Sequence, residues 1–148
     1  MLRSCLVLVL MSLLVGGCNS TITTMERTDK PYAGNLLFKD VSGTVVAVGD
    51  LQLPSSIVIG KTFSGSWKLI SSENDFPSGS TNKARYEGSV ADERYWIDLN
   101  PGVMDNNVVL KGTWQSDGTL SGNWITATIA GGKEMGTFTL KGKRPTVR

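Results

Sequence analysis

The chain has 148 residues, nearly equal numbers of basic and acidic side chains, and no histidine. This length fits one domain with its own hydrophobic core, and a formal net charge of +2 without a basic stripe argues against nucleic acid as a partner. The lack of histidine excludes Ser-His-Asp and Cys-His catalytic arrangements and the usual zinc sites.

The first element is a hydrophobic segment near the start of the chain. Met1–Ser4 carries one charge, Arg3, and Leu6–Val15 consists mostly of leucine and valine. A short basic start, an apolar stretch of ~7–15 residues and small residues at its end are typical of a secretory signal peptide. A membrane-spanning helix needs ~20 apolar residues, so we expect residues 1–17 to be a signal peptide that is removed.

The end of this segment, Val15-Gly16-Gly17-Cys18, resembles the lipobox of bacterial lipoproteins, in which an aliphatic residue and two small ones precede a cysteine. The resemblance implies that Cys18 is lipidated on its thiol and, after cleavage, acylated on its amine. Two or three acyl chains would hold the protein stably on a membrane. Asn19 follows the cysteine where an Asp would retain the protein at the inner membrane. The resemblance therefore implies the outer membrane, facing the periplasm, in a Gram-negative host, and otherwise the outer face of the plasma membrane.

Residues 18–31 are predicted to be the lipidated cysteine followed by a flexible tether. They are polar, rich in threonine and without a sustained apolar period. Cys5 leaves with the signal peptide and Cys18 is expected to carry lipid, so no thiol remains for a disulfide. The single domain expected over residues 32–148 must then depend on its hydrophobic core.

From Tyr32 onward, short segments rich in Val, Ile, Thr and aromatic residues alternate with Gly, Asn, Asp and Ser clusters, which is typical of strands. Turns are expected at Asp117-Gly118 and at Ala130-Gly131-Gly132-Lys133. The expected strands are Asn35–Asp40, Thr44–Leu53, Lys61–Ser71, Lys83–Val90, Arg94–Leu99, Asn107–Gln115, Gly118–Thr128 and Glu134–Gly142.

A large apolar residue, a glycine and a tryptophan recur at alternate positions. The repeats are Phe63-x-Gly65-x-Trp67, Leu110-x-Gly112-x-Trp114 and Leu120-x-Gly122-x-Trp124. Because alternate residues share a face of a strand, each glycine lies beside large apolar side chains on one face while the other face is polar. We expect an all-β fold, an antiparallel up-and-down meander closed into an eight-stranded barrel; a two-sheet β-sandwich is the alternative.

The Gly-x-Trp strands and the hairpin Asp117-Gly118-Thr119-Leu120-Ser121-Gly122-Asn123-Trp124 are weakly similar to avidin and lipocalin barrels over residues 107–141. A barrel of about eight strands either fills with side chains or encloses one small ligand. The pattern favours core positions for Trp67, Trp114 and Trp124, and a ligand cavity lined by them is the alternative.

The segment Arg94–Leu99 is the best candidate for a recognition surface. Its aliphatic face predicts that Arg94, Trp96 and Asp98 point outward, with the tryptophan between opposite charges. A partly exposed tryptophan beside an arginine is typical of binding interfaces. The alternative is a cross-strand pair that simply covers the outer wall of the barrel.

A second local resemblance concerns Ser78-Gly79-Ser80 and Ala84-Arg85-Tyr86. Together these are similar to a Ser-Gly-Ala-Arg-Tyr segment of periplasmic lysozyme inhibitors, which are also small β-barrels, although Thr81–Lys83 interrupts the match. The resemblance implies inhibition of a cell-wall hydrolase by a loop inserted into its cleft.

Carboxylates are the remaining acid–base groups, and those at Asp92, Glu93, Asp98 and Asp105 lie near expected turns, where acidic residues are usually solvated. Asp105–Asn107 lacks the spacing of a calcium loop. We therefore expect no catalytic residues, metal or cofactor. The sequence predicts a lipid-anchored envelope lipoprotein that acts as a non-catalytic binding module, with a membrane and an envelope protein as expected partners. A hydrolase inhibitor and a barrel for a small apolar ligand are the alternatives.

Overall fold

The computed structural model describes residues 30–73, 76–77, 84–103 and 105–148. The predicted signal peptide, Cys18 and all but the last two residues of the predicted tether lie outside the described residues. Ser78–Lys83, most of the segment similar to lysozyme inhibitors, lies outside them too. No helix in the described part of the chain is long and apolar enough to span a membrane.

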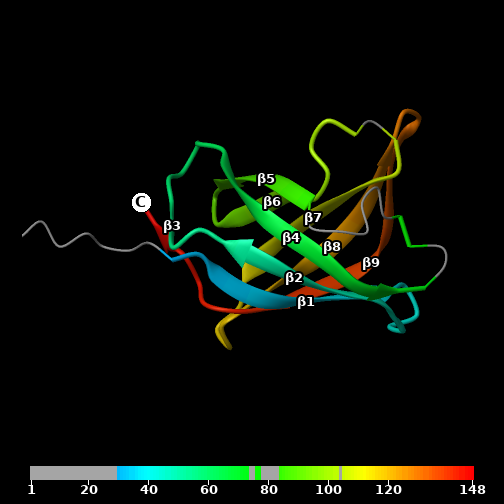
Figure 1. Ribbon diagram of the computed structural model, residues 1–148, viewed down its shortest axis with the longest axis horizontal. Helices are drawn as coiled ribbons and strands as arrows, with labels where there is room; N and C mark the ends of the chain where they lie inside the picture. Colours follow the sequence, from blue (N-terminus) through cyan, green and yellow to red (C-terminus); the bar gives the residue numbers. More distant parts are fainter. Residues whose placement is uncertain (1–29, 74–75, 78–83, 104) are drawn as a thin grey trace, which may run out of the picture.

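Eight antiparallel strands form a closed barrel (Figure 1), as predicted, and the β-sandwich alternative is wrong. Strand β9 pairs with β8 on one side and with β1 on the other, which closes the sheet. The barrel strands, in order, are β1 (Tyr32–Asp40), β2 (Val45–Leu53), β4 (Phe63–Ser72), β5 (Ala84–Ala91), β6 (Arg94–Asp98), β7 (Asn107–Trp114), β8 (Thr119–Thr128) and β9 (Gly131–Lys141).

Two short strands that were not predicted, β3 (Ser56–Ile57) and β10 (Thr146–Val147), pair in parallel beside the barrel. The Arg148 amide donates to the Ile57 carbonyl at 2.9 Å, and the Ile59 amide donates to the Arg148 carbonyl at 3.0 Å. Ile57 is buried in the core, so the end of the chain fastens the β2–β4 connection over one end of the barrel. The start of β1 and the C-terminus lie at this same end (Figure 1).

The hairpin between β7 and β8 forms around Asp117-Gly118 as predicted, with Gly118 at a φ of 80°. The predicted turn at Ala130–Lys133 is displaced: β8 reaches Thr128, β9 starts at Gly131, and Ile129-Ala130 make the turn. Gly131 and Gly132 pair in the ladder, because a glycine stretch can keep its backbone hydrogen bonds when a partner strand runs beside it.

The barrel interior is packed with aromatic and aliphatic side chains. The largest fully buried ones are those of Trp67, Tyr86, Tyr95, Phe38 and Phe138. Several rings meet edge to face, among them Phe38 and Trp124, whose centroids are 5.7 Å apart. Such pairs add ~0.5–1.5 kcal/mol beyond the area that they bury. The core cluster spans all eight barrel strands, as expected of a protein without a disulfide in this domain.

The repeated glycines make room for this packing. A Cβ on Gly88 would lie 2.5 Å from the Phe63 ring, and a Cβ on Gly112 would lie 2.5 Å from the Ser121 carbonyl oxygen and 2.8 Å from the Phe138 ring. The predicted role of glycine beside large rings is thus confirmed at these positions. Where glycine faces glycine, at Gly112 and Gly122, β7 and β8 approach closely.

Candidate groove around Trp96

Strand β6 carries Trp96 on the outside of the barrel. The side chains of Tyr95 and Ile97 point inward and are 2% and 0% exposed, whereas Trp96 is 47% exposed. Arg94 is exposed on the same outer face. The predicted outward position of Arg94 and Trp96 is confirmed, and it follows from the alternation of a strand whose other face is packed into the core.

Strand register places Lys111 of β7 directly opposite Trp96. The Lys111 ammonium lies 3.9 Å from the centroid of the indole ring, a cation–π contact. Such contacts contribute ~0.5–1 kcal/mol at exposed sites, so each side chain restricts the position of the other. On its other side Trp96 pairs with Ser89 of β5, whose short side chain leaves the indole open to solvent.

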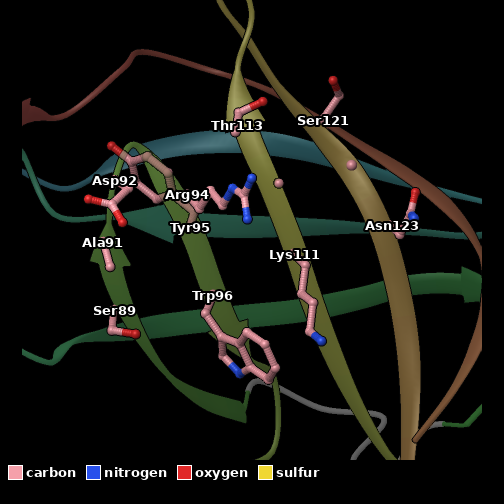
Figure 2. A pocket seen from close by; sticks show the side chains of 12 residues that line it. Ser89, Ala91, Asp92, Arg94, Tyr95, Trp96, Lys111, Thr113, Ser121 and Asn123 are labelled. Atoms are coloured by element: carbon pink, nitrogen blue, oxygen red, sulfur yellow. The ribbon is translucent and has the colours of Figure 1, made fainter.

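A groove of about 710 Å³ runs over this outer face, across β5, β6, β7 and β8. In Figure 2, Lys111 points toward Trp96, Arg94 extends toward β7, and side chains from β8 lie on the far side. The volume of the groove falls within the ~300–1,000 Å³ of pockets that hold small molecules. The lining residues are Ser89, Ala91, Asp92, Arg94, Tyr95, Trp96, Lys111, Gly112, Thr113, Ser121, Gly122 and Asn123.

The floor of the groove lies where β7 and β8 approach each other closely. Gly112 faces Gly122, and the outward residues on either side of this pair include short ones, Thr113 opposite Ser121. Both glycines lie at inward-facing positions of their strands, so the backbone forms the floor between two rows of outward side chains. One row runs Ser89, Trp96, Lys111, Asn123 from β5 to β8, and the next runs Ala91, Arg94, Thr113, Ser121.

The groove carries more positive than negative charge. Arg94 and Lys111 line it, and Asp92 is its one lining carboxylate. Within the described part of the chain, the ion pairs are Arg85 with Glu87 at 3.3 Å and Arg144 with Glu93 at 4.0 Å. Neither groove cation takes part in these pairs, so both charges are available to a ligand.

Asp98, predicted with Arg94 and Trp96 on the outer face, does not line the groove. It is half-buried, and one of its carboxylate oxygens accepts hydrogen bonds from the Asn100 amide at 3.0 Å and the Asn107 side-chain amide at 2.7 Å. Through this hydrogen bond Asn107, which belongs to the segment Asp105–Asn107, holds the β6–β7 connection. The described residues contain no group of three or more His, Cys, Asp or Glu side chains placed to bind a metal.

The other three tryptophans belong to the barrel packing. Trp67 and Trp124 are buried, and their indole N–H groups donate to the carbonyls of Leu99 and Lys39. Trp114 is partly buried and packs edge-on against Tyr95, with centroids 6.3 Å apart. None of the three lines the groove.

Several groove residues were not predicted from the sequence to be site residues: Ser89, Lys111, Thr113, Ser121 and Asn123. Asp92 was considered only as an acid–base group. Lys111, Thr113, Ser121 and Asn123 occupy the polar face of the Gly-x-Trp strands. Their alternation with apolar residues indicates the outer face, but only the pairing of β7 with β6 and β8 shows that they surround Trp96.

Comparison with protein-family models, with curated proteins and with solved structures gives no match for this chain. The fold and the site together define a closed antiparallel barrel with a filled interior and a groove on its outer wall.

Proposed function

We propose that the protein is a lipid-anchored, non-catalytic binding module of the bacterial envelope, and that the groove around Trp96 is its binding surface. The observation that carries the proposal is a half-exposed tryptophan held by Lys111 inside a groove on a rigid sheet. Exposed aromatic residues flanked by arginine are favoured anchors of binding surfaces. The packed core argues for a ligand on the outside of the barrel and against one inside.

The anchor is supported by the resemblance of Val15–Cys18 to a lipobox. With Asn19 after the cysteine, the proposed location in a Gram-negative host is the outer membrane, on its periplasmic side, and in other bacteria it is the outer face of the plasma membrane. The polar stretch between Cys18 and Tyr32 would let the barrel stand off the lipid at ~3.3 Å per extended residue.

One experiment tests both parts of the proposal in the producing bacterium. Cells expressing the wild type should incorporate radioactive palmitate into the protein, and Cys18→Ala should abolish the labelling. The unlipidated Cys18→Ala protein is then purified and sedimented with isolated envelope fragments. Adding Trp96→Ala should lower the affinity for the fragments by about tenfold, the usual scale of an interface anchor.

Ile70→Ala is the matched control, because Ile70 is 54% exposed on β4 and lies outside the groove. It should leave binding to the fragments unchanged. Equal palmitate labelling of wild type and Cys18→Ala would refute the anchor. Equal binding of the Trp96→Ala and Ile70→Ala proteins would refute the groove as the binding surface.

A further inference from the structure

The lining of the groove combines three kinds of group within one site. Two cations, Arg94 and Lys111, lie beside one large ring, Trp96. Beside them lie short hydroxyl and amide side chains, Thr113 on β7 and Ser121 and Asn123 on β8 (Figure 2). A ligand that satisfies all three must carry negative charge, an apolar ring face or edge, and several hydroxyl groups.

The two cations of the groove, Arg94 and Lys111, are positioned to bind an anion. Lys111 is held over the indole at 3.9 Å by an attraction that leaves its charge unneutralised. An anion that binds there meets an ammonium whose side chain is already restricted, so less conformational entropy is lost on binding. Arg94 presents a planar guanidinium that can donate two parallel hydrogen bonds to a carboxylate or phosphate.

The hydroxyl and amide groups suit a ligand rich in hydroxyls. Ser89 and Ser121 have short side chains that can both donate and accept, and they stand on strands whose backbone is fixed by ladder hydrogen bonds. Asn123 is oriented by its own bond to Glu134, at 2.9 Å, and its side-chain carbonyl can accept. A site built to pair hydroxyl groups discriminates strongly against ligands that lack them.

The same geometry argues against a protein strand as the ligand. The groove crosses the middle of a closed sheet, and each of its four strands is paired on both sides, so no free edge is available for a peptide to extend. The apolar residue types that line the groove are Trp96, Ala91 and a small part of Tyr95, without the row of large aliphatic side chains that receives an amphipathic helix.

We propose that the groove binds an acidic glycan, a chain of sugar units that carries carboxylate or phosphate groups. Arg94 and Lys111 pair with the acidic group, a sugar ring lies against the exposed part of Trp96, and Thr113, Ser121 and Asn123 bond its hydroxyls. This inference rests on the proposed function, because it names the ligand class of the same groove. The groove would accept a few units of a longer chain.

The test measures binding of the purified Cys18→Ala full chain to defined probes by calorimetry. The acidic probes are an oligogalacturonate, for carboxylate, and a phosphorylated mannan oligosaccharide, for phosphate. The fully methyl-esterified oligogalacturonate keeps the sugar and removes the charge. Polyglutamate keeps the charge and removes the sugar. At least one acidic sugar should bind, at least tenfold more tightly than the ester or polyglutamate, and the two acidic arms show which anion is preferred.

Variants then place the binding in the groove. Arg94→Gln and Lys111→Gln should each weaken binding of the preferred acidic sugar about tenfold and reduce its dependence on salt, since each removes one charge contact. Lys68→Gln is the matched control, because Lys68 is an exposed lysine of β4 outside the groove. The indole N–H signal of Trp96 in an NMR spectrum should shift with the acidic sugar, and circular dichroism should show that every variant is folded.

The proposal is overturned if the ester or polyglutamate binds as tightly as the acidic sugars, if no sugar binds, or if Lys68→Gln weakens binding as much as Lys111→Gln. These outcomes are separable from failure of the proposed function. If no sugar binds but envelope fragments still bind through Trp96, the glycan is wrong and the binding module stands. If Trp96→Ala leaves binding to envelope fragments unchanged, the groove is refuted as the binding surface, whatever the sugars do.

Discussion

At the scale of single residues, Gly112 connects the core to the groove. Its inner side has no room for a methyl group, because the Phe138 ring and the Ser121 carbonyl already occupy that space. Any residue at this position would turn its side chain inward, so the backbone of β7 forms part of the groove floor on the outer side. The glycine is required by the packing of the barrel, which brings β7 and β8 close together beneath the groove.

Gly112→Ala should destabilise the protein by about 3 kcal/mol, the upper part of the range for adding a methylene group to a packed core. The nearest contact would be a backbone oxygen at 2.5 Å, which cannot move aside like the end of a flexible chain. Urea unfolding followed by tryptophan fluorescence measures the change. Ser64→Ala, at an exposed position of β4, should change the free energy of unfolding by no more than about 0.5 kcal/mol. Similar values for the two variants would contradict this account of the glycine.

The residue scale also shows what the sequence can predict about the groove. The alternation in Arg94–Leu99 is sufficient to place Trp96 outside and Tyr95 inside, since one face must be buried. It cannot show that Lys111 lies over the indole, because that contact depends on which residues of β6 and β7 are paired. It also gives Asp98 an outward position but not its hydrogen bonds to Asn100 and Asn107, which come from the β6–β7 connection.

At the scale of elements, the β5–β6 hairpin carries strain next to the groove. Its two turn residues, Asp92 and Glu93, have φ values of 49° and 62°. Tight two-residue hairpins need positive φ at both positions, and Asp-Gly or Asn-Gly are the favoured pairs. For an L-residue the left-handed conformation costs ~1–2 kcal/mol, and glutamate has no local hydrogen bond that offsets it as aspartate has.

Glu93→Gly should therefore stabilise the protein by about 0.5–1 kcal/mol, after allowance for the greater flexibility of glycine in the unfolded chain. The lost contact with Arg144 is 4.0 Å long and exposed, so it offsets little of this gain. Thermal unfolding should show a melting temperature a few degrees higher. The same substitution at Glu87, within β5, should lower the melting temperature. A fall in both variants would show that the turn is unstrained.

The eight barrel strands were predictable because apolar residues or glycines alternate with polar ones along at least part of each strand. Strands β3 and β10 are two residues long, too short for any period, and they form only because the end of the chain reaches Ser56. The β5–β6 turn contains no glycine, but its position was predictable because it lies between two predicted strands. The β8–β9 turn was displaced because Gly131 and Gly132 resemble turn residues but are held in register by β8.

At the scale of the whole molecule, the buried tyrosines limit the pH range in which the fold is stable. Tyr86 is fully buried and its hydroxyl donates to the Gln52 carbonyl at 2.6 Å, and burial raises its pKa well above the ordinary value of 10.0. Burial also raises the pKa of Tyr95, while the nearby Trp114 N–H and Arg144 act in the opposite direction. In the unfolded chain both hydroxyls would ionise near pH 10.

The free energy of unfolding should accordingly be insensitive to these tyrosines below about pH 9 and should fall as the pH rises above about 10. In that range the unfolded chain loses protons that the folded chain retains, so alkali favours unfolding. Each tyrosine contributes up to ~1.4 kcal/mol per pH unit. Tyr86→Phe should reduce this slope, measured by urea unfolding between pH 9 and 11, even though it loses a hydrogen bond at every pH. An unchanged slope in this variant would contradict the assignment.

Strand β1 pairs with β2 over most of its length and with β9 from Asn35 to Asp40, and it is the strand that follows the proposed tether. If the chain is held at Cys18 and a ligand pulls on the groove, the load enters at Tyr32 and runs along β1. Ladder bonds lie across the strand direction, so many of them on both sides would carry that load together in shear. A strand at an open edge pulled sideways would instead lose its bonds one after another. The closed barrel thus gives the protein mechanical strength in the direction in which an anchored binding module would be stretched.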